Sequence, residues 1–207
     1  MEDNSGLKCI LGKHCVYNLF QEIVGGNSAR KKFISDYVKA NAGDKIVEIG
    51  CGPAQLLPWL VNIRYIGIDT NKDYIDSAKK EYRSQGLFLL GDTKLYEDDT
   101  RVLDADIVIC SAILHHLNDD EAVHAIKFAY KVLKKGGRLV CGEPCWVPNQ
   151  GYISKWILSN DRGKNIRDEE GYKRIMRGIF KNSNISSIID LKPLRIPSTS
   201  VIITCVK

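Results

Sequence analysis

A glycine-containing loop carries the first residues that could do chemistry. The loop is Gly50-Cys51-Gly52, and it directly follows a short apolar run. Glycines at such a turn let the backbone bend sharply and approach a ligand closely. A dinucleotide-binding loop needs a third glycine where this chain has Gln55, and the carboxylate of Glu48 would repel a pyrophosphate. We therefore expect this loop to bind a ligand with positive charge, such as a sulfonium or an ammonium.

Acidic residues follow the next two apolar runs. Asp69 lies nineteen residues after Gly50, and a carboxylate at this place can accept both hydroxyl groups of a ribose. Asp92 follows the third run with Thr93 beside it, and its carboxylate could accept a hydrogen bond from an adenine amino group. A helix N-cap at Asp69 and a turn-forming Asp92 are the purely structural alternatives. Together with Glu48, this pattern favours S-adenosylmethionine over NAD.

The elements that must position these residues alternate along the chain. Apolar runs predict strands at 45–49, 64–68, 87–90, 106–110 and 137–141, and helical patterns separate them at 29–41, 54–60, 73–85 and 119–133. Continuous apolar strands between helices indicate a parallel sheet covered on both faces, with ligands at the carboxyl ends of the strands. We predict an α/β fold with a doubly wound, mostly parallel, seven-stranded Rossmann-like sheet. The last two runs, 185–191 and 200–206, predict an antiparallel pair at a sheet edge, after a helical insert.

A single domain accommodates all 207 residues. We expect an N-terminal cap (1–26), a cofactor-binding core (27–145), a helical substrate cap (146–182) and a closing β-hairpin (183–207). The hydrophobic content of 44% excludes a disordered chain, and the apolar runs are too short to span a bilayer. The N-terminus lacks the basic-then-apolar order of a signal peptide, so we expect a cytoplasmic protein. Seven cysteines without a CxxC pair predict neither a disulfide framework nor a metal site.

Five motifs stand in order between residues 27 and 145. They are Glu48-Ile49-Gly50-Cys51-Gly52, Asp69, Gly91-Asp92, the run 106–117 with Leu114-His115-His116-Leu117, and the turn Lys134-Lys135-Gly136-Gly137. These motifs resemble those of class I S-adenosylmethionine-dependent methyltransferases, and the resemblance implies methyl transfer from that cofactor. The segments 17–26, 143–148 and 161–167 also resemble a narrower group of bacterial small-molecule methyltransferases. The Asn/Asp-Pro-Pro-aromatic run of nucleobase amino methyltransferases does not follow the fourth strand.

The resemblance and the strand positions together define the candidate cofactor residues. They are Glu48, Gly50, Cys51, Gly52, Asp69, Asp92, Thr93 and Ser111. Tyr17 could donate its hydroxyl to the methionine carboxylate, although it could equally pack a helix. His116 and His115 are candidate general bases, because neutral imidazole accepts a proton near pH 7. The alternative for both histidines is packing or a wall of the cofactor site, since only some acceptors need a base.

The segment 145–182 holds the candidates for binding an acceptor. It carries eight basic and four acidic side chains, together with several tryptophans and tyrosines. Guanidinium forks and aromatic faces suit an acceptor with a carboxylate or a phosphate, so we predict substrate contacts from Trp146, Arg162 and Arg167. A solvated amphipathic helix is the alternative for its lysines.

The predicted function is methyl transfer to a small anionic metabolite, with no membrane partner. Three alternatives stay open. An NAD-dependent oxidoreductase is disfavoured by Gln55 and Glu48. An RNA methyltransferase is disfavoured because the net charge of +5 includes no long basic run. A non-catalytic scaffold is disfavoured by the acidic residues at the strand ends.

Overall fold

The computed structural model describes residues 25–190, 193–194 and 196–207 of the chain. Tyr17 and most of the expected N-terminal cap lie outside the described residues.

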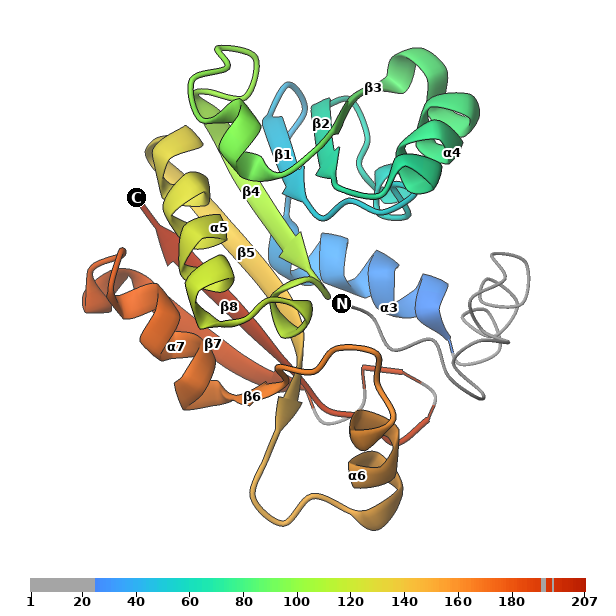
Figure 1. The fold of residues 1–207 in the computed structure, drawn as a ribbon, viewed down its shortest axis with the longest axis vertical. Helices are drawn as coiled ribbons and strands as arrows, with labels where there is room; N and C mark the ends of the chain where they lie inside the picture. The colour runs from blue at the N-terminus through green and yellow to red at the C-terminus, as the bar shows by residue number, and fades with distance from the viewer. Residues whose placement is uncertain (1–24, 191–192, 195) are drawn as a thin grey trace.

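One mixed sheet forms the centre of the molecule (Figure 1). Its strands are β1 (Lys45–Ile49), β2 (Arg64–Asp69), β3 (Gly86–Leu90), β4 (Ala105–Ser111), β5 (Leu133–Trp146), β7 (Ile185–Asp190) and β8 (Ser200–Val206), and the short β6 (Arg167–Asp168) pairs separately with β5. The order is β3-β2-β1-β4-β5-β8-β7, in which β1 to β5 are parallel and β8 is antiparallel to both of its neighbours. The predicted fold class is therefore confirmed. The chain proceeds outward from β1 in both directions, so the strand order reverses between β1 and β4, and folds of this kind bind ligands at the carboxyl ends of such strands.

Helices connect the strands and cover the sheet. They are α3 (Gly26–Lys32), which continues as the π-helix η1 (Phe33–Val38), α4 (Lys72–Tyr82), α5 (Asp119–Val132), α6 (Tyr152–Ser159) and α7 (Glu169–Arg177). Short 3-10 turns complete the list: η2 (Leu57–Trp59), η3 (Arg83–Gln85), η4 (Thr93–Tyr96), η5 (Leu114–His116) and η6 (Asn182–Asn184). The start of α5 is fixed by a capping box, in which Asn118 and Glu121 each accept the backbone N–H of the other.

The prediction of a helix over 54–60 was wrong. The structure has only the 3-10 turn η2 there. Gly52 and Ala54 both adopt positive φ values, and Pro58 removes a backbone donor within the segment. These features replace a regular helix by successive turns that place the glycine loop above β1.

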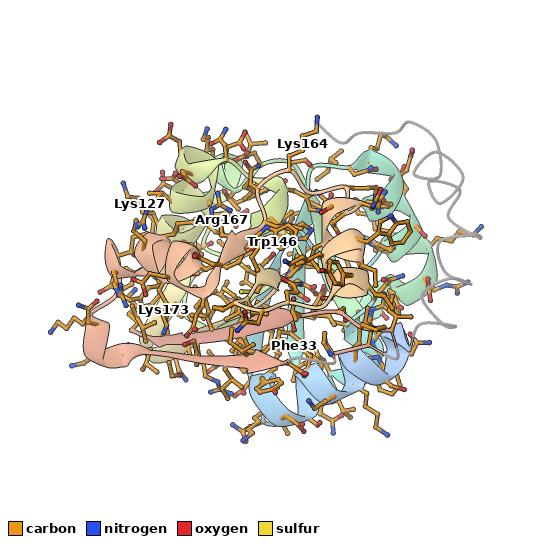
Figure 2. All side chains as sticks on the ribbon, turned by 90° about the horizontal axis from the view of Figure 1, so that it is seen from below. Phe33, Lys127, Trp146, Lys164, Arg167 and Lys173 are labelled. Carbon is orange, nitrogen blue, oxygen red and sulfur yellow. The ribbon has the colours of Figure 1, made fainter. Side chains whose placement is uncertain are left out.

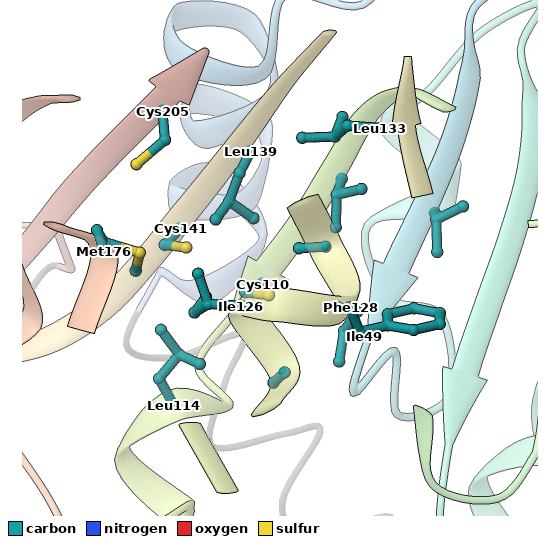
Figure 3. Packing of buried hydrophobic residues seen from close by; sticks show 14 of the residues in the cluster. Ile49, Cys110, Leu114, Ile126, Phe128, Leu133, Leu139, Cys141, Met176 and Cys205 are labelled. Carbon is teal, nitrogen blue, oxygen red and sulfur yellow. The ribbon is translucent and has the colours of Figure 1, made fainter. Parts of the chain in front are cut away.

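Two hydrophobic clusters lie on the two faces of the sheet. One contains the buried faces of α5 and α7, including Phe128, Ile126 and Met176, together with the strand cysteines Cys110 and Cys141 (Figure 3). The other cluster contains residues of η1 and α4 against the opposite face. Thus α7, although it lies within the expected cap 146–182, is part of the layer that covers the sheet. By contrast, α6 lies beyond the carboxyl end of β5 (Figure 1).

None of the described helices is both long enough and apolar enough to cross a bilayer.

Candidate functional site

The glycine loop after β1 leaves room for a ligand. The N–H groups of Gly50 and Cys51 both donate to the carbonyl of Ile68, at 2.8 and 3.1 Å, which ties the loop to β2. Gly50 and Gly52 have φ values of 69° and 53°, a conformation that favours glycine. A Cβ on Gly50 would lie 2.6 Å from the side chain of Ile113, whereas a Cβ on Gly52 would meet no heavy atom within 4 Å. The loop is therefore closely packed at Gly50 and open at Gly52.

Asp69 lies at the open side of this loop. One carboxylate oxygen accepts the N–H of Gly52 and the other accepts the N–H of Asn71, both at 2.8 Å. The N-cap of α4 is Asn71, whose side chain accepts two backbone N–H groups, so the N-cap alternative for Asp69 was wrong. A carboxylate oxygen can accept more than one hydrogen bond, and a carboxylate at this place is suited to recognise a ribose diol.

Glu48 is a buried acid beneath the loop. Its side chain accepts the hydroxyl of Tyr65 at 2.5 Å, and the residue is 3% exposed. Burial is the main reason that the pKa of Glu48 is raised to about 8; Tyr65 and Arg30 oppose this rise, and the nearby Asp69 contributes to it. Glu48 therefore holds a proton at neutral pH, and a cation beside it would favour its ionised form.

The other predicted cofactor residues differ in how they are placed. The Cys51 thiol is buried against Gly67, so any contact with a cofactor must come from its backbone. Asp92 is exposed and caps η4 by accepting the N–H of Lys94 at 2.9 Å, as its turn-forming alternative predicts, and Thr93 beside it is buried. Ser111 is half-buried at the end of β4.

A network of buried polar groups occupies the carboxyl end of β4. Glu143 on β5 accepts the backbone N–H groups of Ile113, Leu114 and His115, at 3.0, 2.9 and 3.3 Å. The same carboxylate lies 2.7 Å from Nδ1 of His115, and Nε2 of this histidine lies 3.3 Å from Asp161. His115 is 3% exposed, and burial alone would lower its pKa. Hydrogen bonds to Asp161 and Glu143 outweigh burial and raise the pKa of His115 to about 9.

His116 lies beside this network. Its ring centroid is 4.1 Å from that of His115, and the residue is half-buried. The two histidines that the sequence predicts as candidate bases are therefore in contact but in different environments. His115 is held between two carboxylates, which makes it a poor proton acceptor at neutral pH.

The segment 161–167 is docked onto η5. The N–H of Asn165 donates to the carbonyl of His115 at 2.9 Å. Asp161 accepts the N–H of Gly163 at 2.7 Å as well as contacting His115. A Cβ on Gly163 would overlap the His115 ring and lie 2.8 Å from its carbonyl oxygen, so only glycine allows this close approach.

Arg167 fastens the same segment to the body of the protein. Its guanidinium donates to the carbonyls of Leu114, Leu117 and Asn165 at 2.9 to 3.0 Å, and it makes two hydrogen bonds to Asp119. These five hydrogen bonds use the five N–H groups that an arginine side chain has. Arg167 therefore has no donor left for a substrate in this conformation.

Comparison with known proteins finds methyltransferases, as the glycine loop and the acidic strand ends lead us to expect. A family model described as a methyltransferase domain matches residues 47–141. The chain is 28% identical over 154 residues to an uncharacterised methyltransferase of Oceanobacillus iheyensis, covering 70% of this chain and 71% of that protein. It is 31% identical over 124 residues to an uncharacterised 37.1 kDa transposon protein of Streptomyces fradiae, covering 56% of this chain but only 34% of that protein. The chain thus spans about a third of the length of the Streptomyces relative.

Solved structures share the fold. An S-adenosylmethionine-dependent methyltransferase from Archaeoglobus fulgidus has a TM-score of 0.71 and 18% identity, covering 91% of this chain and 99% of that chain. A geranyl diphosphate C-methyltransferase from Streptomyces coelicolor, solved with Mg²⁺ and S-adenosyl-L-homocysteine, has a TM-score of 0.64 and 18% identity, covering 86% and 75%. These comparisons support a class I S-adenosylmethionine-dependent methyltransferase. They agree with the predicted enzyme class and cofactor, and they favour S-adenosylmethionine over the NAD-dependent alternative.

In this methyltransferase the predicted acceptor residues do not form one cluster. Arg162 is half-buried and Lys164 is exposed, both on the docked segment. Figure 2 shows Lys164 projecting from the edge of the molecule, while Arg167 lies over its body. Trp146 lines a surface cavity of about 430 Å³ together with three acidic residues, Asp168, Glu169 and Glu170, and one basic residue, Lys173. The excess of carboxylates in that cavity does not suit an anionic acceptor.

Sequence reasoning did not assign roles to Glu143, Asp161, Gly163 and Asn165. Glu143 could have been found, because a carboxylate in the apolar run of a buried strand requires hydrogen-bond donors around it. The other three come from a segment without strong periodicity, and their contacts with His115 depend on the tertiary fold.

Proposed function

We propose that this methyltransferase transfers a methyl group from S-adenosylmethionine to a small anionic metabolite. The observation that carries the acceptor part is the docking of the basic segment 161–167 onto η5, through Asn165 and Arg167. This segment carries Arg162 and Lys164 and is docked on the turn after β4, and Ile113 of that turn packs against Gly50 of the glycine loop.

The residues around the glycine loop fit the cofactor. Bound S-adenosylmethionine supplies an electrophilic methyl group on a positively charged sulfur. Asp69 would accept the ribose hydroxyls, and the open space beside Gly52 would admit the ligand close to the backbone. Glu48 would ionise in response to the positive charge of the ligand. In the same proposal Asp92, Thr93 and Ser111 line the adenine and outer parts of the site.

The acceptor is proposed to be anionic because the segment docked on the turn after β4 carries two basic side chains, Arg162 and Lys164. Arg162 and Lys164 lie three residues or fewer from Gly163 and Asp161, which hold the segment against His115. An arginine can bind a carboxylate or a phosphate bidentately. The geranyl diphosphate C-methyltransferase with a similar fold acts on a small diphosphate, which supports an acceptor of this class.

Alignment is the main task of these residues in the proposed reaction. An acceptor lone pair attacks the methyl carbon in line with the breaking carbon–sulfur bond, and S-adenosyl-L-homocysteine leaves. Holding the two reactants in this geometry supplies most of the acceleration. His115 is unsuited to take the acceptor proton because both of its nitrogens face carboxylates. A proton released by the acceptor therefore passes to water or to a side chain other than His115.

The test is methyl transfer from radiolabelled S-adenosylmethionine to a panel of small carboxylates and phosphates, with RNA as a further acceptor. Arg162→Gln should raise the KM for the anionic acceptor about tenfold or more, because a charged hydrogen bond contributes about 1.5–3 kcal/mol. The matched control is Arg174→Gln, which removes an exposed arginine from α7 and should leave KM unchanged. Equal effects of the two substitutions, or transfer to RNA alone with steep salt dependence, would contradict the proposed acceptor class.

A further inference from the structure

Two histidines and a carboxylate converge at the carboxyl end of β4. Candidate ligand atoms of His115, His116 and Asp161 all lie within 4.8 Å of one another. His115 Nε2 is already 3.3 Å from the Asp161 carboxylate. Two ligands that each lie about 2.0–2.1 Å from a tetrahedral zinc ion are roughly 3.3 Å apart. The separation therefore equals the edge of such a coordination sphere, and it is long for a charge-assisted hydrogen bond.

The other nitrogen of His115 has the partner that a metal-bound histidine normally has. Nδ1 lies 2.7 Å from the buried carboxylate of Glu143, which is also fixed by two shorter bonds from the backbone of Ile113 and Leu114. A carboxylate that accepts Nδ1–H sets the tautomer and aims the lone pair of Nε2 at a metal ion. Glu143 thus orients His115 from the side opposite to Asp161.

Charge and access also favour a cation here. Glu143 and Asp161 carry two negative charges within reach of His115. A divalent ion that displaces the proton from Nε2 of His115 would balance both charges. The Asp161 side chain is 37% exposed and His116 is half-buried, so an ion can enter from the docked segment although His115 itself is buried.

We propose that His115, His116 and Asp161 form a binding site for a divalent transition-metal ion such as Zn²⁺, with Glu143 orienting His115. The sequence predicts no metal site because the two halves of this cluster are far apart along the chain. Two imidazoles and one carboxylate suit zinc and its neighbours in the first transition row, whereas Mg²⁺ prefers oxygen ligands. The ion ties the segment 161–167 to η5 and leaves at least one coordination position to water. A coordinated His116 nitrogen cannot accept a proton, so this site assigns His116 to coordination and not to base catalysis.

The test is calorimetric titration of the full chain, freed of metal with EDTA and desalted, with Zn²⁺ and with Mg²⁺. One Zn²⁺ should bind per chain, and millimolar Mg²⁺ should not bind. Glu143→Gln should weaken Zn²⁺ binding about 10- to 100-fold, and His116→Ala and Asp161→Asn should weaken it more. The control His124→Ala removes a half-buried histidine of α5 that lies near Glu97, and this variant should bind Zn²⁺ like the unchanged chain.

Further readouts separate this site from other sources of zinc binding. Visible absorption of the Co²⁺-loaded chain should lack the sulfur-to-cobalt charge-transfer band that a thiolate ligand gives. Asp161→Asn keeps an oxygen that can accept the Gly163 N–H, so it should fold even if His116→Ala does not. Binding of S-adenosyl-L-homocysteine verifies that each variant is folded. Absent Zn²⁺ binding, or binding that survives both Asp161→Asn and His116→Ala, would overturn the site and leave His115 as an ion-pair residue only.

Discussion

The buried carboxylate of Glu143 holds both the ring of His115 and the backbone that precedes it at the end of β4. The carboxylate lies 2.7 Å from the imidazole Nδ1, and the same carboxylate accepts backbone N–H groups that precede the ring. A side chain from β5 therefore organises the turn after β4, although 28 residues separate the two side chains in sequence. The segment that carries the proposed acceptor contacts is docked on this turn.

Glu143→Ala should destabilise the protein strongly. It leaves His115 and the N–H groups of Ile113 and Leu114 buried without their acceptor. Removing one partner of a buried charged pair costs about 3–5 kcal/mol. Glu143→Gln keeps an oxygen acceptor and should cost less. Urea unfolding at pH 7 of the two variants measures the difference, and equal losses would show that the carboxylate oxygens are not what holds the turn.

Asp69→Asn should weaken cofactor binding without unfolding the protein. The amide keeps one oxygen for a backbone N–H group, but it loses the charge and one of the two acceptors now used by Gly52 and Asn71. A hydrogen bond to a charged group contributes about 1.5–3 kcal/mol, so the affinity for S-adenosyl-L-homocysteine should fall about 10- to 100-fold. Calorimetric titration measures this. Asp76→Asn, at an exposed Lys72 pair on α4, is the matched control and should bind normally.

The sequence predicts the cofactor half of the site because its signals are local. The glycines of the loop follow β1 at once, and Asp69 ends β2, so the parallel pairing of these strands brings them together. Buried parallel strands are visible in the sequence as continuous apolar runs, so the sheet that brings these residues together can be predicted. The same logic predicts the antiparallel pair β7–β8, although β8 lies inside the sheet between β5 and β7.

The acceptor half was less predictable because its contacts are long-range. Arg167 was expected to bind substrate, yet its donors reach carbonyls of Leu114 and Leu117, 53 and 50 residues earlier. Every residue has a backbone carbonyl group, so the sequence does not indicate which carbonyls will accept hydrogen bonds from an arginine. Whether such an arginine binds substrate or backbone carbonyls depends on the tertiary position of its segment, and the residue types alone do not specify that position.

The ionisation of Glu48 should make stability depend on pH. Burial raises its pKa from 4.5 to about 8, so the folded protein retains a proton that the unfolded chain releases. The free energy of unfolding should therefore be largest below the unfolded pKa, and it should decrease as pH rises between the two values, by up to ~1.4 kcal/mol per pH unit. Above pH 8 this contribution should stay constant.

Glu48→Gln isolates this effect, since the amide oxygen can still accept the hydroxyl of Tyr65. His115, with its raised pKa, adds a dependence of the same sign near pH 7 to 9. The difference between the two proteins, from urea unfolding at pH 5 to 9, therefore reports Glu48. Curves that remain parallel across this range would mean that Glu48 is already ionised in the folded protein.

Gly163→Ala should separate the docked segment from η5, whereas Gly151→Ala should do almost nothing. A Cβ at 163 would overlap the His115 ring and lie 2.8 Å from the carbonyl that Asn165 bonds, while a Cβ at 151 would meet no atom within 4 Å. Forcing a group into a packed site costs about 1–3 kcal/mol, and an unobstructed surface substitution changes stability by about 0.5 kcal/mol or less. Both variants should bind S-adenosyl-L-homocysteine normally, because the glycine loop and Asp69 are untouched. Urea unfolding compares them directly. A Gly163→Ala protein as stable as Gly151→Ala would mean that the segment has room beside His115, and the proposed acceptor and metal contacts would then lose their structural basis.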